Sequence, residues 1–186
     1  GTHIDPPAHI FPDGRTLDEF PPEQFIGKAL VIECSDLNEG KAIINEKSVY
    51  FEAESEAGEV EISMQWTETY SENVRSFANN IDTTDGGTHL EGFRTALTKT
   101  INEYARKKNL LKEKDENLSG EDCREGLTAV ISVKLTDAQF EGQTKAKLGN
   151  ASMRTLVDAI VSDKLMQFLD ENPVVARTIL DKAMMA

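Results

Sequence analysis

Apolar residues in this chain recur at every second position in one part and at helical spacing in another. Within residues 59–66, Val60, Ile62, Met64 and Trp66 alternate with polar side chains, which is the pattern of a half-buried β-strand. Farther along, one apolar face at helical spacing is formed by Leu90, Phe93, Leu97, Ile101 and Tyr104. The two periods together predict an α+β or layered α/β fold, with helices packed on one sheet.

Residues that favour turns, mainly Gly, Pro, Asn and Asp, divide the chain into the remaining expected elements. Strands are expected at residues 29–34, 47–54, 59–66, 73–80 and 127–135. One helix should begin at Thr88, where Thr88 and Glu91 have the spacing of a capping box, and should end near the basic residues 106–108. A second helix should cover residues 153–169, and Pro173 should open a third. Residues 109–126 and 140–147 are expected to be loops.

Charge and composition limit the function classes. The formal net charge of −13 over 186 residues makes the chain a poor autonomous binder of the DNA backbone. Residues 1–46 hold nine acidic and three basic side chains, a denser negative charge than the rest, which suggests a boundary near residue 46. No apolar run reaches the roughly 20 residues of a membrane span, and the start is no signal peptide. We therefore expect a cytoplasmic protein without membrane contact, in which Cys34 and Cys123 are reduced thiols.

Three separated segments carry a resemblance to a known family. They are SFANNIDTTDGGTHLEGFRTA at 76–96, EDCREGLTAVISV at 121–133 and FEGQTKAKL at 140–148. In this order they resemble the gyrase B and topoisomerase IV subunits of type IIA DNA topoisomerases, from about Lys47 to Ala186. The resemblance implies a transducer domain over residues 42–186, with a ribosomal-protein-like fold and a left-handed βαβ crossover.

The resemblance also implies a site and a mechanism. In the family, a Gln-Thr-Lys loop reaches over to ATP, which is bound with magnesium in a neighbouring ATPase domain; here that loop is Gln143, Thr144 and Lys145. Lys145 would act catalytically by neutralising charge on the γ-phosphate, and Gly142 would give the backbone freedom to approach. Spacing alone would favour a solvated polar loop. The implied partners are the ATPase domain, the A subunit and DNA, and the implied role is to couple ATP binding and hydrolysis to DNA strand passage.

The first 35 residues resemble another family. Gly-Thr-His-Ile-Asp at 1–5 and Pro-Ala-His at 7–9 are similar to the metal-binding motif of cyclase-family hydrolases, which include kynurenine formamidases. His3, Asp5 and His9 would then bind zinc or manganese, which would activate water for attack on an amide or ester. The motif's leading His and the family's later ligands have no counterpart in this sequence. A foreign Pro-rich and β fragment at residues 1–41, without hydrolase chemistry, is the preferred interpretation.

Three hypotheses follow: a topoisomerase fragment, a metal-dependent amide or ester hydrolase, and a folded chimera without activity. The absence of an initiator Met suggests an excised piece. The sequence contains no segment resembling the ATPase, Toprim or DNA-cleaving parts, so we expect no activity from the chain alone. The strand at 29–34 is expected to join the sheet, and an unpaired sheet edge would favour self-association.

Overall fold

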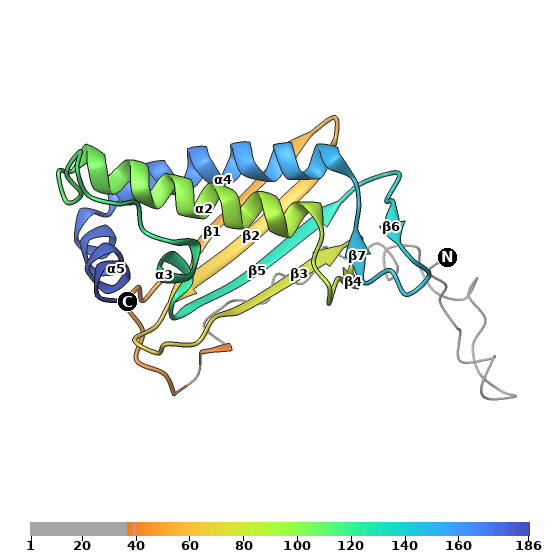
Figure 1. The fold of residues 1–186 in the computed structure, drawn as a ribbon. Coiled ribbons are helices and arrows are strands. Elements are labelled where there is room, and N and C mark those ends of the chain that lie inside the picture. The colour runs from red at the N-terminus through yellow and green to blue at the C-terminus, as the bar shows by residue number, and fades with distance from the viewer. Residues whose placement is uncertain (1–36, 39) are drawn as a thin grey trace, which may run out of the picture. The chain divides into compact units, whose positions relative to one another are not determined.

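The structure of the chain is a computed structural model that describes residues 37, 38 and 40–186. Its main feature is a five-stranded sheet with helices on one face (Figure 1). The strands are β1 (Val49–Ser55), β2 (Gly58–Trp66), β3 (Asn73–Ala78), β4 (Ile81–Asp82) and β5 (Leu127–Lys134). The helices are α2 (Thr88–Lys107), α3 (Gly120–Arg124), α4 (Ala151–Glu171) and α5 (Pro173–Met185). A separate two-stranded hairpin is made of β6 (Phe140–Glu141) and β7 (Lys147–Leu148).

The sheet combines antiparallel and parallel pairs in the order β1-β2-β5-β3-β4. β2 pairs antiparallel with β1 and with β5, and β3 pairs antiparallel with β4. β3 and β5 run parallel, and the chain between them passes through β4, α2 and α3. The mixed α/β class predicted from the two hydrophobic periods is therefore confirmed, and so are the strands expected at 47–54, 59–66, 73–80 and 127–135.

The core lies between the sheet and the helix pair α2 and α4. The apolar side chains of β2 that alternate in sequence, from Val60 to Trp66, are all nearly fully buried. On β5 they face Leu127, Ala129, Ile131 and Val133 in direct register. Phe93 and Leu97 of α2, with the buried residues of α4 from Met153 to Leu169, belong to the same apolar cluster. Burial of this shared surface is the main force that holds the helices on the sheet.

The opposite face of the sheet is also partly covered, which the alternating pattern did not predict. The alternation places Ser63 and Gln65 on the face opposite Val60 and Trp66, and both are buried. Gln65 accepts a hydrogen bond from Asn38 and donates one to the Asn45 carbonyl. Thr128 of β5 donates to Asn38 at 2.8 Å. Polar side chains can be buried here because the segment before β1 provides hydrogen-bond partners for them.

Local sequence signals were wrong at two places. The expected capping box does not form, because α2 has Gly87 as its N-cap and Thr88 lies inside the helix, where its hydroxyl has no partner among the described residues. A capping box forms instead at Ser119 and Asp122, which begin the short helix α3 within the expected loop 109–126.

The expected strand at 29–34 lies outside the described residues. Among those that are described, no helix is long and apolar enough to span a bilayer.

Candidate functional site

The polar tripeptide at residues 143–145 lies at the tip of the β6–β7 hairpin. Gln143 and Thr144 are exposed, and Lys145 is half-buried. Two residue pairs close the hairpin below them: Phe140 opposite Leu148, and Glu141 opposite Lys147. The Lys147 ammonium also forms an ion pair with Glu141 at 3.0 Å. The structure thus presents residues 142–146 as a short, accessible loop on a closed stem.

Lys145 has an unusual backbone conformation for a residue with a side chain. Its φ angle is +56°, in the left-handed region that costs most residues about 1 kcal/mol or more. Its ammonium lies over the Phe140 ring, 6.0 Å from the centroid, which is a cation–π distance. Gly142 has a φ of +77°, and a Cβ added there would meet nothing within 4 Å. The space beside Gly142 is therefore open, whereas Lys145 is half-buried against the ring.

The hairpin is docked on the turn that precedes α2 (Figure 1). The Asp85 amide donates to the Ala146 carbonyl at 2.9 Å, and the Leu148 amide donates to the Gly86 carbonyl at 3.1 Å. Gly87 and Leu148 also form an isolated parallel bridge. The sequence alone favours a structural role for Gly86, Gly87 and Thr88, as the turn and cap of a helix, and does not predict this contact with the hairpin. Two adjacent glycines were the available signal, since they often mark a close approach of two backbones.

The other side of the hairpin is held by Asn150, the N-cap residue of α4. Its side chain accepts from the Gln139 amide at 2.7 Å and donates to the Asp137 carbonyl at 2.9 Å. The Gly149 amide donates to the Gln139 carbonyl at 2.7 Å. The loop of Lys145 is therefore connected at its base to the first turns of both long helices, α2 and α4.

His89 lies two residues beyond the Gly-Gly turn and is fully buried. Its Nε2 is 3.1 Å from the Thr83 hydroxyl, which donates to the Ser76 carbonyl. In this arrangement Nε2–H is the donor to Thr83, and Nδ1 is unprotonated and has no partner among the described residues. Burial lowers the pKa of His89 to about 4, because an imidazolium here would lose its water and gain no acceptor. His89 is thus a neutral core residue that ties the start of α2 to β3.

The other candidate site, a metal centre, lies where the structure gives no information. His3, Asp5 and His9 fall outside the described residues. Within residues 37, 38 and 40–186, no group of three or more His, Cys, Asp or Glu side chains is arranged to hold a metal ion. The metal ligands therefore stay a prediction from sequence.

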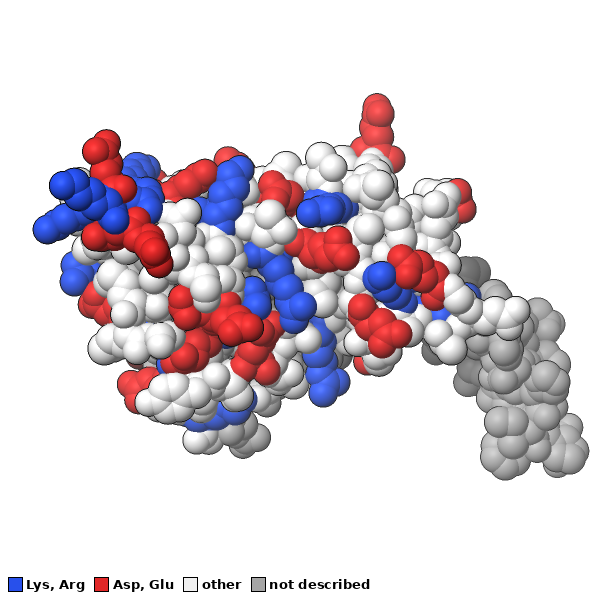
Figure 2. Space-filling model, in the orientation of Figure 1, with Lys and Arg blue, Asp and Glu red and all other residues white. Residues whose placement is uncertain are grey.

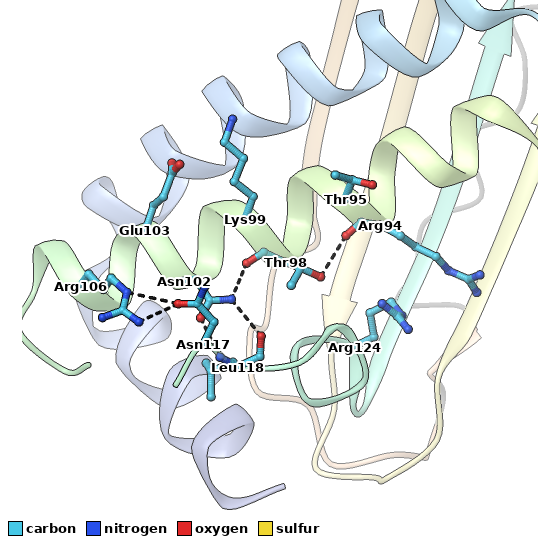
Figure 3. Close-up of a pocket in the computed structure, with 10 residues that line it drawn as sticks. All are labelled: Arg94, Thr95, Thr98, Lys99, Asn102, Glu103, Arg106, Asn117, Leu118 and Arg124. Carbon is cyan, nitrogen blue, oxygen red and sulfur yellow. Dashed lines mark hydrogen bonds between the residues drawn. The ribbon is translucent and has the colours of Figure 1, made fainter. Parts of the chain in front are cut away.

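A groove runs along α2 where α3 and the preceding loop pack against it (Figure 3). Arg106 donates to the Lys112 and Asp115 carbonyls and to the Asn117 side chain, so it fastens the loop to the end of α2. Asn102 also bonds this loop through both the carbonyl and the amide of Leu118. These hydrogen bonds hold the loop on α2, so the polar residues of the groove have a structural role.

Charges of both signs alternate over the helical face (Figure 2). Arg94 of α2 and Arg124 of α3 both pair with Glu72, at 2.9 and 3.0 Å. At the end of α2, Lys107 and Lys108 both pair with Asp170 of α4. Figure 2 therefore shows a surface of mixed charge on this side.

Comparisons with known proteins identify the family. The family model described as DNA gyrase B matches residues 34–186. The DNA gyrase B protein of Clostridium acetobutylicum is 54% identical over 153 residues, which cover 82% of this chain and 24% of that protein. The DNA gyrase B protein of Enterococcus faecalis is 53% identical over 81% of this chain and 23% of its own length. This chain thus spans about a quarter of the length of these relatives.

A solved structure agrees with these relatives. The 43K ATPase domain of Thermus thermophilus gyrase B, in complex with an aminocoumarin, superposes with a TM-score of 0.76 at 39% identity. The match covers 81% of this chain and 40% of that one. The family match includes residues 34–41, which had been assigned from sequence to the front fragment, so the position of that boundary stays a prediction. Because the match covers most of the chain, the chain belongs to the DNA gyrase B family.

Proposed function

We propose that residues 42–186 act as the transducer of a gyrase B protein and that Lys145 senses the γ-phosphate of ATP. The observation that carries the proposal is the short loop 142–146, which presents Lys145 on a hairpin whose base is hydrogen-bonded to residues at the starts of α2 and α4. In the proposed state the lysine leaves the Phe140 ring and reaches nucleotide in an adjoining ATPase domain. The parallel pairing of β3 and β5 around α2 is compatible with the βαβ crossover of such a domain.

The chemistry follows from charge. An ATP γ-phosphate carries negative charge that spreads over its oxygens as the terminal bond breaks, and an ammonium placed there stabilises it. Magnesium bound with the nucleotide would supply further positive charge. The Gln143 amide and Thr144 hydroxyl are exposed and could add directed hydrogen bonds. Loss of the phosphate would then release the loop and allow the domain to move, which couples hydrolysis to strand passage on DNA held with the A subunit.

The lysine's present contact is weak enough for such a switch. An exposed cation–π contact contributes roughly 0.5–1 kcal/mol, whereas a hydrogen bond to a charged group contributes about 1.5–3 kcal/mol. Moving the ammonium from the ring to a phosphate would therefore be favourable. The left-handed backbone of Lys145 is a local cost that the closed hairpin stem sustains.

The test uses a hybrid in which residues 42–186 replace the equivalent part of Clostridium acetobutylicum gyrase B, assayed for ATP turnover with its A subunit and DNA. Lys145→Ala should lower turnover by about tenfold or more. Lys147→Ala is the matched control, because that lysine is two residues away and pairs with Glu141 instead. If Lys145→Ala keeps the turnover of the parent hybrid, the proposed role is wrong.

A further inference from the structure

The hairpin that carries Lys145 reaches the rest of the fold through a very close backbone contact. A Cβ built on Gly87 would lie 2.3 Å from the Leu148 carbonyl oxygen and 2.5 Å from the Leu148 nitrogen. Both obstructing atoms belong to the backbone, so they cannot rotate away as a side chain could. The φ angle of Gly87, +128°, is also one that residues with a side chain rarely adopt. Only glycine fits this position while the hairpin stays docked.

The neighbouring Gly86 has more space for a side chain than Gly87. A Cβ on Gly86 would meet the Cδ2 atom of Leu90 at 2.8 Å, and that atom is the end of a flexible side chain. Gly86 instead contributes its carbonyl, which accepts from the Leu148 amide. The two glycines therefore play different parts: Gly86 provides a hydrogen bond, and Gly87 provides the space that lets the bond form.

Behind the turn, buried hydrogen bonds connect the chain to the sheet and to α2. The Gly86 amide donates to the Thr83 carbonyl at 2.8 Å. Thr83 is held in turn by Ser76 of β3 and by His89 of α2, all of them buried. The start of α2 is therefore attached to the sheet on one side and to the hairpin on the other. A displacement of the hairpin would be passed to α2 through the backbone of residues 85–87.

From this geometry we infer that Gly87 is a positioning residue, which seats the hairpin so that Lys145 is placed for the γ-phosphate and the loop's position is transmitted to α2. The inference rests on the proposed function for the role of Lys145. The seat itself, the contact of residues 85–87 with Ala146 and Leu148, can be tested without nucleotide.

The first experiment measures native-state amide hydrogen exchange in the full chain. Gly87→Ala should speed exchange of the Leu148 and Asp85 amides by about tenfold or more, because both bonds need the docked hairpin. The Ile131 amide, in the central strand β5, should keep its protection. Gly40→Ala is the matched control: its φ is also positive, +78°, but nothing lies within 4 Å of an added Cβ. Unchanged protection of Leu148 in Gly87→Ala would overturn the inference.

A second variant keeps the test possible if Gly87→Ala does not fold. Asp85→Pro removes the amide that donates to Ala146 without adding a Cβ at Gly87. If Gly87→Ala fails to fold, Asp85→Pro should still speed exchange at Leu148 and leave Ile131 protected. Equal protection of Leu148 in Asp85→Pro and in the parent chain would then count against the seat.

The second experiment separates the seat from the proposed function in the same hybrid gyrase. Gly87→Ala should lower ATP turnover, and adding it to Lys145→Ala should cause no further loss, because both act through one lysine. A double variant whose loss is the product of the two single losses would refute positioning. If Gly87→Ala undocks the hairpin by exchange while Lys145→Ala leaves turnover intact, the seat stands and the proposed role of Lys145 fails.

Discussion

Acidification should destabilise the fold through His89. The folded state holds the imidazole neutral, with a pKa of about 4, whereas an unfolded chain would return it to its usual 6.5. Between these two values the unfolded state binds more protons, so stability is complete above pH 6.5 and falls as the pH drops toward 4. At about 1.4 kcal/mol per pKa unit, the full loss is about 3 kcal/mol, of which about 2 kcal/mol appears by pH 5.

The assay is urea unfolding of the chain and of His89→Gln at pH 7.5 and pH 5. Glutamine keeps a donor that can reach Thr83 but does not titrate, and all carboxylates are shared by the two proteins. The difference in unfolding free energy between them should therefore change by about 2 kcal/mol in favour of the variant at pH 5. A difference that stays constant between the two pH values would refute the assignment of a buried, neutral His89. If the variant does not fold, the imidazole resonances of the parent chain give the same answer, since His89 should not titrate above pH 5.

Three other outcomes follow from the described contacts. Ser119→Ala should cost about 1 kcal/mol in urea unfolding, because it removes the side-chain acceptor for the Asp122 amide in the capping box of α3. Leu165→Ala should cost about 2–5 kcal/mol by the same measurement, since this α4 side chain is fully buried in the core. In a Cys34→Ser background, a thiol reagent at pH 8 should leave folded Cys123 unmodified and react once urea unfolds the chain, because burial raises the pKa of this thiol to about 12. Rapid modification of the folded protein would contradict the buried position of Cys123.

The spacing of hydrophobic residues predicted the strands and helices well, but it did not predict which segments pack against them. The alternation in β2 and the helical spacing in α2 depend only on neighbours in sequence, and both elements appear where they were predicted. The burial of Gln65 depends on Asn38 and Asn45, which lie 27 and 20 residues away. A local pattern does not contain such contacts, so it predicts a half-buried strand, whereas Ser63 and Gln65 on the polar face of β2 are buried as well.

The failed capping box has a similar cause. Threonine followed by glutamate three residues later is a sound local signal, but Gly87 takes the cap position because the backbone of Leu148 passes next to it. A long-range contact thus overrode a local preference. The site shows the same division: resemblance to a family gave Gln143, Thr144 and Lys145 as a nucleotide loop, which stays a prediction. The contact of residues 85–87 with Ala146 and Leu148, which holds the hairpin, is visible only in the structure, because these residues lie about 60 positions apart in sequence.

The proposed role of Lys145 is tested most directly by comparing nucleotide affinities in the hybrid gyrase B protein. Titration calorimetry would give the ratio of affinities for a non-hydrolysable ATP analogue and for ADP, before and after Lys145→Ala. If Lys145 contacts the γ-phosphate, the ratio should fall by about 10- to 100-fold in the variant, with ADP affinity unchanged, because the lost contact is to the γ-phosphate alone. An unchanged ratio would contradict the claim that this loop senses the phosphate.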